Sequence, residues 1–322
     1  MDAAARGIPV TGLTVVIGYG AAGRATAQAL AARGDETCVA QRSRPADLPP
    51  QATFRPCDVL DAQSVRQAIA GARQVVLAVG FPYDARVWRK VWPKTITNVV
   101  EACAATGARM VFVDNLYMLG PQRKPRREDM PLTNRGEKPA ILSEVTRIWM
   151  AAAAAGRVRI TALRCTDFYG PGVPVSHLGA HALGRLAQGE PALLLVPPDI
   201  PHDFAYVPDI ARAVITLLDA PDDAFGQVWN MPCAPTRTPR QILQLGADAL
   251  SVKLRIRAIP LWLLPLLGPF SRFPREVADV GFTWDRPYEV DATKFTRRFW
   301  SDVTPYEVGA PATALSFKVT HG

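Results

Sequence analysis

Short apolar runs alternate with stretches of helical composition along the first half of the chain. The continuous apolar run at 13–17 is typical of a parallel strand that is buried on both faces. The alanine-rich stretch at 21–32, which Gly34 ends, predicts a helix. The same alternation predicts further strands at 37–41, 53–55, 74–79, 109–113 and 159–164 and further helices at 62–70, 85–105 and 141–155.

Strands that alternate with helices imply βαβ units with right-handed crossovers. The expected fold class is therefore α/β, a Rossmann-type doubly wound parallel sheet. After Tyr169 the pattern becomes irregular, and it predicts helices at 177–188, 208–218, 239–250 and 260–267 and short strands at 192–196, 227–230 and 254–258. We expect a Rossmann dinucleotide-binding domain over 1–170 and mainly a smaller C-terminal substrate-binding lobe over 171–322, with some segments returning to the Rossmann core.

Composition narrows the class of protein. The 322 residues are 48% hydrophobic and 20% charged, as in a globular chain and unlike a disordered one. The net charge of +8 is spread over the sequence, and no basic helix is interleaved with aromatic residues. We therefore expect an anionic cofactor or substrate and no nucleic acid. The five cysteines are scattered without a CxxC, which predicts free thiols in a reducing compartment and no metal.

The sequence contains no segment that predicts a membrane partner. Residues 1–11 lack the apolar stretch of a secretory signal. The longest apolar stretch, at 258–270, is too short to span a bilayer and contains three prolines. We therefore expect a cytoplasmic protein.

A glycine-rich turn, GYGAAG at 18–23, joins the first strand to the first helix. Gly18 allows the tight turn, Gly20 lets the backbone approach a pyrophosphate, and Gly23 lets the helix pack close to the strand. The helix N-terminus offers free N–H groups and a positive dipole end to phosphates. The turn predicts a dinucleotide site made by Gly18, Tyr19, Gly20, Ala21, Ala22 and Gly23; a glycine turn that only packs is the alternative.

The end of the second strand distinguishes between two cofactors. An NAD site usually has Asp or Glu at this position, whereas residues 40–44 read AQRSR. Arg42, Ser43 and Arg44 suit a 2′-phosphate, because guanidinium groups pair with phosphate oxygens. We therefore expect NADP(H), with NAD as the less favoured cofactor; solvated loop charges are the alternative role of the two arginines.

Two further stretches complete the predicted cofactor site. Asp58 and Val59 follow the third strand, where Asp58 could accept a hydrogen bond from adenine or cap a helix. Asp61 is expected to be a helix cap. Val79 and Gly80 end the fourth strand and leave room for a ribose. Phe81, which follows them, is assigned to the substrate.

Over residues 12–300 the chain resembles the extended short-chain dehydrogenase/reductase family, the group of nucleotide-sugar epimerases and dehydratases. The resemblance rests on the glycine turn, DVLD at 58–61, Asn98, VFVDNLYMLG at 111–120, Arg164 with YGPG at 169–172, and HDFAYVPDIA at 202–211. It implies that 58–61 contacts adenine, that Asn98 is structural, and that 111–120 holds the active-site turn. It also implies that 202–211 returns from the substrate lobe.

The chemistry of that family needs a Tyr and a Lys four residues apart on one helix face, together with a Ser or Thr. Counted from Gly120, the serine position falls on Asn115, and the other two fall on or near Ala140 and Glu144. The predicted helix has no Tyr-x-x-x-Lys. The resemblance therefore implies an atypical member of the family.

Other side chains could substitute for the missing pair. Tyr117 in the active-site turn could donate a proton, and Lys138, just before the predicted helix, could reach the nicotinamide ribose. Asp114 and Asn115 could bind substrate or a catalytic water. A core role is the alternative for Tyr117.

Two residues of the second half are assigned to the substrate. Tyr169 lies at the C-terminal end of a strand, where sites in such sheets form, although core packing is its alternative. His202 should line the cleft, because the strand with Phe204 and Tyr206 should return beneath it.

Three other features have both a functional and a structural interpretation. The histidines at 177 and 181 could hold a metal, but without a third ligand we expect surface histidines. The basic loop at 122–127 could meet a diphosphate or be a solvated charge run. The apolar run at 261–267 could wall a hydrophobic pocket or pack within the lobe.

Together these features predict an NAD(P)-dependent oxidoreductase or epimerase-like enzyme that acts on a small carbonyl or hydroxyl compound, nucleotide sugars being one class. The missing Tyr and Lys motivate an alternative, a non-catalytic NADP(H)-binding redox sensor. A redox-neutral isomerase or lyase is a third hypothesis. The family often dimerises through the helices that flank its fifth strand, so a homodimer through 96–105 and 141–155 is also considered.

Overall fold

The computed structural model describes residues 12–194, 196–258, 276 and 279–319. Its described residues form two compact units, which we treat separately. Unit 1 comprises Met1–Met118, Leu132–Arg164 and Ile210–Trp229. Unit 2 comprises Leu119–Pro131, Cys165–Asp209 and Asn230–Gly322.

Unit 1 is built around a seven-stranded sheet of order β10-β6-β5-β4-β1-β2-β3. The strands are β1 (Thr14–Ile17), β2 (Thr37–Gln41), β3 (Thr53–Pro56), β4 (Gln74–Leu77), β5 (Arg109–Asp114), β6 (Ile160–Arg164) and β10 (Val228–Asn230). The helices are α1 (Ala21–Arg33), α2 (Ala62–Ala68), α3 (Ala85–Thr106), α4 (Glu137–Ala154) and α6 (Val207–Asp219). Apart from α4, the elements of the first half lie within two residues of their predicted bounds.

The strands from β3 to β6 pair in parallel, with Val15 opposite both Cys38 and Val75. β1 and β4 have the sequences TVVI and QVVL and are buried throughout, as expected of strands covered by helices on both faces. The chain leaves β1 toward β2 and β3 and then returns to β4, so the strand order reverses between β1 and β4. The predicted doubly wound sheet is thereby confirmed, and this reversal is where such sheets bind ligands.

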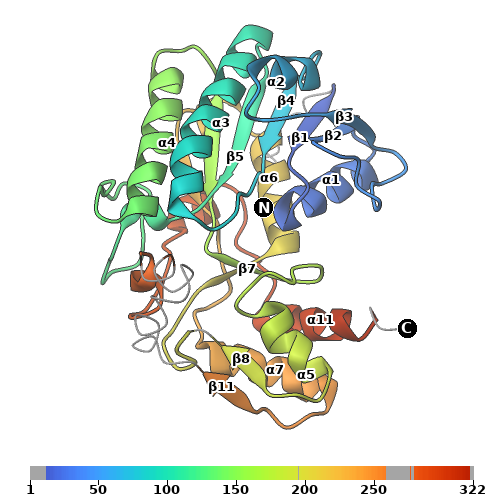
Figure 1. Cartoon of the computed structure of the whole chain (residues 1–322), viewed down its shortest axis with the longest axis vertical. Coiled ribbons are helices and arrows are strands. Elements are labelled where there is room, and N and C mark those ends of the chain that lie inside the picture. Colours follow the sequence, from blue (N-terminus) through green and yellow to red (C-terminus); the bar gives the residue numbers. More distant parts are fainter. Residues whose placement is uncertain (1–11, 195, 259–275, 277–278, 320–322) are drawn as a thin grey trace. The chain divides into compact units, whose positions relative to one another are not determined.

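Helices cover both faces of this sheet. Figure 1 shows α3 and α4 side by side over one face. The right-handed crossover between β1 and β2, which runs in the opposite direction to that between β4 and β5, places α1 on the other face. Arg33 of α1 is paired with Asp219 at the end of α6. No helix in the described ranges is long and apolar enough to cross a membrane.

Helix α4 begins four residues before its predicted start. Gly136, with a φ of 88°, is its N-cap, and Pro139 lies in its first turn. Proline is tolerated there because first-turn N–H groups have no partner within the helix. The proline-rich sequence before Ile141 was therefore wrongly excluded from the helix, and Lys138 lies inside its first turn.

Unit 2 contains two small parallel sheets and several helices. β7 (Asp167–Tyr169) pairs with β9 (Phe204–Tyr206), and β8 (Ala192–Leu194) pairs with β11 (Ile256–Ala258). Its helices include α7 (Pro239–Leu250), which has the predicted bounds, and α10 (Thr293–Arg298) and α11 (Tyr306–Val319), which were not predicted. The helix predicted at 177–188 is a π-helical turn, Gly179–Gly184, followed by α5 (Arg185–Ala187). The helix predicted at 260–267 lies outside the described residues.

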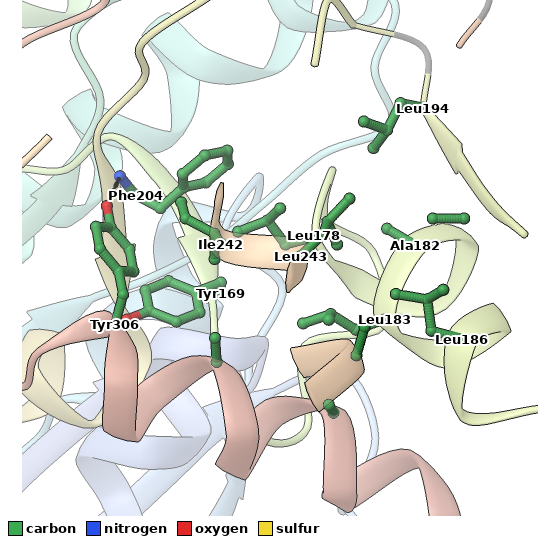
Figure 2. Packing of buried hydrophobic residues seen from close by; sticks show 14 of the residues in the cluster. Tyr169, Leu178, Ala182, Leu183, Leu186, Leu194, Phe204, Ile242, Leu243 and Tyr306 are labelled. Carbon is green, nitrogen blue, oxygen red and sulfur yellow. Dashed lines mark hydrogen bonds between the residues drawn. The ribbon is translucent and has the colours of Figure 1, made fainter. Parts of the chain in front are cut away.

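The core of unit 2 is formed by side chains from α5, α7, α11 and the two small sheets. Figure 2 shows Leu183, Leu186 and Leu243 facing one another, with Tyr306 at the other end of the cluster. The Tyr306 hydroxyl accepts a hydrogen bond from the backbone N–H of Phe204 at 3.0 Å. This core therefore connects the C-terminal helix to the β7/β9 sheet.

Within unit 1, the side-chain amide of Asn98 donates a hydrogen bond to the carbonyl of Val59 at 2.9 Å. The predicted structural role of Asn98 thus has a clear basis, because it fixes the loop after β3 to α3. We expect Asn98→Ala to lower the free energy of unfolding by about 1 kcal/mol. Urea unfolding measures this, with the exposed neighbour Thr97→Ala as the matched control. Equal effects of the two substitutions would contradict the assignment.

Candidate functional site

The glycine turn after β1 contains two glycines that packing requires. Gly18 has a φ of 94°, and a Cβ there would lie 2.6 Å from the carbonyl oxygen of Ala78. A Cβ at Gly23 would lie 2.1 Å from the carbonyl oxygen of Gly18. Side chains at these two positions would push α1 away from β1 and β4.

Gly20 is different, because the protein itself gives it no steric reason to be glycine. Its φ is −72°, which any residue adopts, and no atom lies within 4 Å of a Cβ built there. It is the N-cap of α1, no side chain caps the helix, and the first turn holds no acidic residue. The open space beside Gly20 and Ala21 thus adjoins a helix N-terminus that attracts anions. A dinucleotide pyrophosphate fits this cradle.

Tyr19 has a structural contact within the turn. Its hydroxyl donates a hydrogen bond to the carbonyl of Asp47 at 3.1 Å, and the guanidinium of Arg24 lies 3.5 Å from the carboxylate of Asp47. Partial burial, together with the charge of Asp47, raises the pKa of Tyr19. Tyr19 therefore attaches the loop after β2 to α1.

The loop after β2 presents its basic residues to solvent. Arg42, Ser43 and Arg44 are exposed, and the side-chain amide of Gln41 donates to the carbonyl of Ser43 at 2.9 Å. Among the described residues, Arg42 and Arg44 form no ion pair. Both guanidinium groups are therefore available to a ligand at the tip of this strand.

The loop after β3 is held by its own polar side chains. Asp61 caps α2 by accepting from the N–H groups of Gln63 and Ser64, as predicted. Asp58 is exposed, and its carboxylate accepts from the N–H of Leu60 at 2.9 Å. Asp58 therefore stabilises a turn and does not cap the helix; its contact with adenine stays a prediction.

Aromatic side chains fix the loop after β4. β4 ends at Leu77, so Val79 and Gly80 lie in this loop, where a Cβ on Gly80 would meet open space. Phe81 contacts Trp92 edge to face, with ring centroids 5.0 Å apart. The indole N–H of Trp88 donates to the carbonyl of Pro82 at 2.8 Å. Phe81 is thus half-buried against α3.

The turn after β5 uses its polar side chains for backbone hydrogen bonds. The carboxylate of Asp114 accepts from the N–H of Asn115 at 2.8 Å, and the side chain of Asn115 accepts from the N–H of Tyr117 at 2.9 Å. These bonds start the 3₁₀ turn Tyr117–Leu119, in which Tyr117 is half-buried. Asn115 is thus engaged in holding the turn, and Tyr117 stays a predicted proton donor.

Asp114 forms a buried ion pair with Arg164, the residue opposite it in the sheet register. Their side chains are 1% and 2% exposed, and Asp114 Oδ2 lies 3.8 Å from Arg164 Nε. Burial raises the pKa of Asp114 to about 6, although Arg164 and the N–H of Asn115 oppose the shift. The structure thus corrects the prediction that Asp114 binds substrate or water, because its carboxylate faces the interior.

Lys138 is fully buried at the start of α4. Its Nζ lies 4.3 Å from the ring centroid of Tyr83 and 5.9 Å from that of Trp88. Sequence reasoning missed Tyr83, which lies two residues beyond Phe81, the last residue of the stretch assigned to the cofactor and substrate. Its position after a strand at the reversal of the sheet was the available signal.

Tyr169 lies in the core of unit 2, and the structure corrects its assignment to the substrate. It is 1% exposed, and its ring centroid lies 5.1 Å from that of Tyr206 and 5.5 Å from that of Tyr306. Figure 2 shows its ring inside the apolar cluster. A Cβ on Gly309 would lie 2.5 Å from the Tyr169 hydroxyl, so α11 closes over this side chain.

His202 is also buried, and packing explains its position better than a substrate cleft does. Its ring stacks on that of Trp284, with the ring centroids 3.7 Å apart and an interplanar angle of 2°. It also stacks on the ring of Tyr288, with a centroid distance of 4.8 Å and an angle of 12°. Its Nε2 lies 2.9 Å from a carboxylate oxygen of Asp167. Burial lowers the pKa of His202, while Asp167 opposes that shift.

The stack continues beyond His202 on both sides. The ring of His177 lies 4.3 Å from that of Trp284, and the guanidinium of Arg126 lies 3.6 Å over the ring of Tyr288. Arg126 is fully buried, so the loop at 122–127 is only partly the solvated charge run that one interpretation predicts. His181 is exposed, and the described residues include no group of three or more potential metal ligands.

The other basic residues of this loop lie at the surface. Arg127 pairs with Asp129 at 2.6 Å. A surface pocket of about 420 Å³ is lined by Lys124, Arg127, Asp129 and Asp291 among others. Its lining mixes both charges, which does not favour a diphosphate there. The apolar run at 261–267 lies outside the described residues.

A family model described as the NAD dependent epimerase/dehydratase family matches residues 13–231. A UDP-glucose 4-epimerase from Thermus thermophilus, solved with NAD, is 20% identical with a TM-score of 0.76, over 95% of this chain and 98% of that one. A UDP-glucose 4-epimerase from Thermotoga maritima, solved with UDP-glucose, is 19% identical with a TM-score of 0.79, over 96% and 100%. A dTDP-glucose 4,6-dehydratase from Streptomyces venezuelae, solved with NAD, is 17% identical with a TM-score of 0.78, over 96% and 98%.

A search of curated proteins gave no match. The family match and the shared fold confirm the predicted family resemblance and fold class. The family description also agrees with the predicted enzyme class and with a nicotinamide dinucleotide as cofactor.

The two kinds of glycine in the turn can be separated by substitution. We expect Gly23→Ala to destabilise the fold by about 2 kcal/mol or more, because its Cβ would overlap the Gly18 carbonyl. Gly20→Ala should cost less than about 1 kcal/mol but weaken dinucleotide binding at least about 10-fold, because the methyl group fills the cradle. Urea unfolding and fluorescence titration with NADPH measure the two effects. If Gly20→Ala bound NADPH as tightly as wild-type protein, the assignment of Gly20 to the pyrophosphate site would be wrong.

The buried Asp114–Arg164 pair predicts a pH dependence of stability. A folded-state pKa of about 6 exceeds the ordinary value of about 3.9, so the folded state binds more protons between these values. Stability should therefore fall by about 1–3 kcal/mol as pH rises from about 4 to about 6. Urea unfolding across this range should show a flatter profile for Asp114→Asn/Arg164→Met, which removes both charges and leaves neither alone. The same slope in both proteins would refute the assignment.

Proposed function

The chain belongs to the NAD dependent epimerase/dehydratase family, and on this basis we propose that it is an NADP(H)-dependent oxidoreductase or epimerase-like enzyme that acts on a small carbonyl or hydroxyl compound. The matched residues 13–231 include the glycine turn, the loops after β2, β3 and β4, and helix α4. Nucleotide sugars are a candidate substrate class, since solved relatives of this fold are UDP-glucose 4-epimerases and a dTDP-glucose 4,6-dehydratase.

The observation that carries the proposal is the open cradle at Gly20. Gly18 and Gly23 are explained by packing alone, whereas Gly20 borders open space at an uncapped helix N-terminus. That combination suits a pyrophosphate, which needs close backbone approach and N–H donors. In the proposed complex, the first turn of α1 holds the pyrophosphate, and Asp58 and Val59 adjoin the adenine.

The tip of β2 supports NADP(H) over NAD. Residues 42–46 include no acidic side chain, and Arg42 and Arg44 are exposed without ion pairs among the described residues. A 2′-phosphate would give both guanidinium groups an anionic partner. The solved relatives contain NAD, so this tip is the feature through which the chain would differ from them.

When bound, the nicotinamide supplies the hydride chemistry of such enzymes. The residues around its expected position are those of the loops after β4 and β5, together with Lys138 at the start of α4. Lys138 is fully buried at this edge of unit 1. Because no part of this side chain is exposed, it does not reach the ribose as the sequence predicted, and its proposed role is electrostatic, on the proton-transfer group near the nicotinamide.

The sensor hypothesis depends on the absence of a tyrosine from α4, whose sequence is EKPAILSEVTRIWMAAAA. A tyrosine supplied by another element would remove that motive. The homodimer also remains a prediction. α3 and α4 pack side by side, and Met150 on α4 is 40% exposed, which suits a helix-mediated contact.

The proposed cofactor is tested by affinity. We expect wild-type protein to bind NADPH more tightly than NADH, and Arg42→Ala and Arg44→Ala each to weaken NADPH binding about 10-fold, since charged hydrogen bonds contribute about 1.5–3 kcal/mol. NADH binding should change less than about 2-fold. Fluorescence titration measures both, and Arg66→Ala, an exposed arginine on α2, is the matched control. Tighter binding of NADH by wild-type protein would overturn the choice of NADP(H).

Catalysis is tested by incubating the protein and NADPH with ketones, aldehydes and nucleotide sugars. Loss of NADPH absorbance, or conversion of a sugar into its epimer, would support an enzyme. Tight NADPH binding with no conversion across the panel would favour the sensor.

A further inference from the structure

The loop after β4 borders the point where the sheet order reverses. β4 lies between β1, which leads into the glycine turn, and β5, which leads into the turn of Asn115 and Tyr117. Because these strands are parallel, the three connections meet at one edge of the sheet. Tyr83 lies in the middle connection and is 36% exposed. Part of this side chain is therefore open to solvent at this edge.

A buried ammonium group lies against the ring of Tyr83. Lys138 is 0% exposed, and its Nζ is 4.3 Å from the ring centroid. The contact is between two elements distant in sequence, the loop after β4 and the first turn of α4. The contact therefore pairs a partly exposed phenol ring with an ammonium group that solvent does not reach.

The surroundings hold both partners in place. The rings of Tyr83 and Trp88 meet edge to face at 5.5 Å, and Trp88 Nε1 donates to the carbonyl of Pro82 at 2.8 Å. The rings of Trp88 and Trp92 also meet edge to face, with their centroids 6.3 Å apart. On the side of Lys138, Glu137 pairs with Arg89 of α3 at 3.0 Å. The phenol therefore sits on a packed support on α3.

We propose that Tyr83 is the residue that exchanges a proton with the substrate oxygen and that Lys138 is its electrostatic partner. The inference rests on the proposed function and names the acid–base group of that site. An ammonium over a phenol ring stabilises the phenolate more than the phenol, because a charge–charge attraction is added to the cation–π contact. Burial of Lys138 strengthens this effect by excluding solvent.

The proton balance is simple. In the reductive direction the O–H bond of Tyr83 breaks and a new O–H bond forms on the substrate oxygen, while the electron pair for the carbonyl carbon comes from the reduced nicotinamide of the proposed function. The phenolate left on Tyr83 faces the ammonium of Lys138 until solvent returns a proton, which the exposure of Tyr83 permits. In the oxidative direction the same atoms exchange the proton in reverse.

The first test measures the ionisation of Tyr83 without any substrate. Tyrosinate absorbance is followed against pH in wild-type protein and in Tyr83→Phe, and the difference isolates Tyr83 from the other tyrosines. The same comparison, with and without Tyr83→Phe, is then made in protein that also carries Lys138→Met. We expect the Tyr83 transition to move upward by at least about one pH unit when Lys138 is replaced by Met. Lys138→Arg should keep the wild-type midpoint because it keeps the charge, and Lys94→Met, an exposed lysine on α3, should change nothing.

The second test uses activity and cofactor affinity. Tyr83→Phe keeps the ring and should bind NADPH within about 2-fold of wild type, while turnover of any compound found active falls at least about 100-fold. Tyr117→Phe is compared directly, because Tyr117 is the rival proton donor. Lys138→Met should lower turnover and move its pH profile, and Lys138→Arg should restore part of it.

The outcomes separate this inference from the proposed function. An unchanged Tyr83 midpoint in Lys138→Met, or full turnover by Tyr83→Phe, overturns the Tyr83–Lys138 pair even if NADPH binds and is consumed. Failure of wild-type protein to bind NADPH or NADH overturns the proposed function, while the absorbance titration still decides whether the two side chains are coupled.

Discussion

The first turn of α1 lies directly against the backbone that follows β1, which in turn lies against the backbone that follows β4, and most features of the candidate site depend on this close approach. Only hydrogen atoms stand between Gly23 and the Gly18 carbonyl, and between Gly18 and the Ala78 carbonyl. The approach places the uncapped helix N-terminus at the reversal of the sheet. It also leaves Gly20 beside open space, so the same geometry that closes the fold provides the anion cradle.

The chain buries several charged groups, and each has a different compensation. Asp114 and Arg164 share a buried ion pair, Lys138 lies against two aromatic rings, and Arg126 stacks on Tyr288. An ion pair in the sheet fixes the ends of β5 and β6, because loss of one partner would leave the other charge uncompensated. An ammonium against a phenol has a different effect, because the phenol can ionise and the ammonium then stabilises the phenolate. Of these arrangements, only the Lys138–Tyr83 contact has a partly exposed titratable group at the ligand edge.

Local patterns in the sequence were sufficient to predict β1 to β6 and α1 to α3 of unit 1 within two residues. Strand burial, the glycine turn and the Asp61 cap depend on neighbouring residues, so the sequence predicts them directly. The roles of Tyr169 and His202 depend on contacts with α11, Trp284 and Tyr288, which lie a hundred residues or so away or in segments without a clear period. A motif placed these side chains on the right strands, but it did not reveal that they face a core. Tyr83 was missed for a related reason, since its partner Lys138 was taken to precede α4.

The start of α4 connects these observations. A helix that began at Ile141 would leave Lys138 in a proline-rich loop, where a lysine would be solvated and its charge screened. Gly136 instead turns the chain so that Glu137 begins the helix and Lys138 occupies the first turn, packed against the loop after β4. A cation at a helix N-terminus is opposed by the helix dipole, so this position needs another source of stabilisation. The faces of Tyr83 and Trp88 supply it. The two rings therefore account for how this charge is tolerated, and the proposed acid–base role of Tyr83 would account for why it lies at this position.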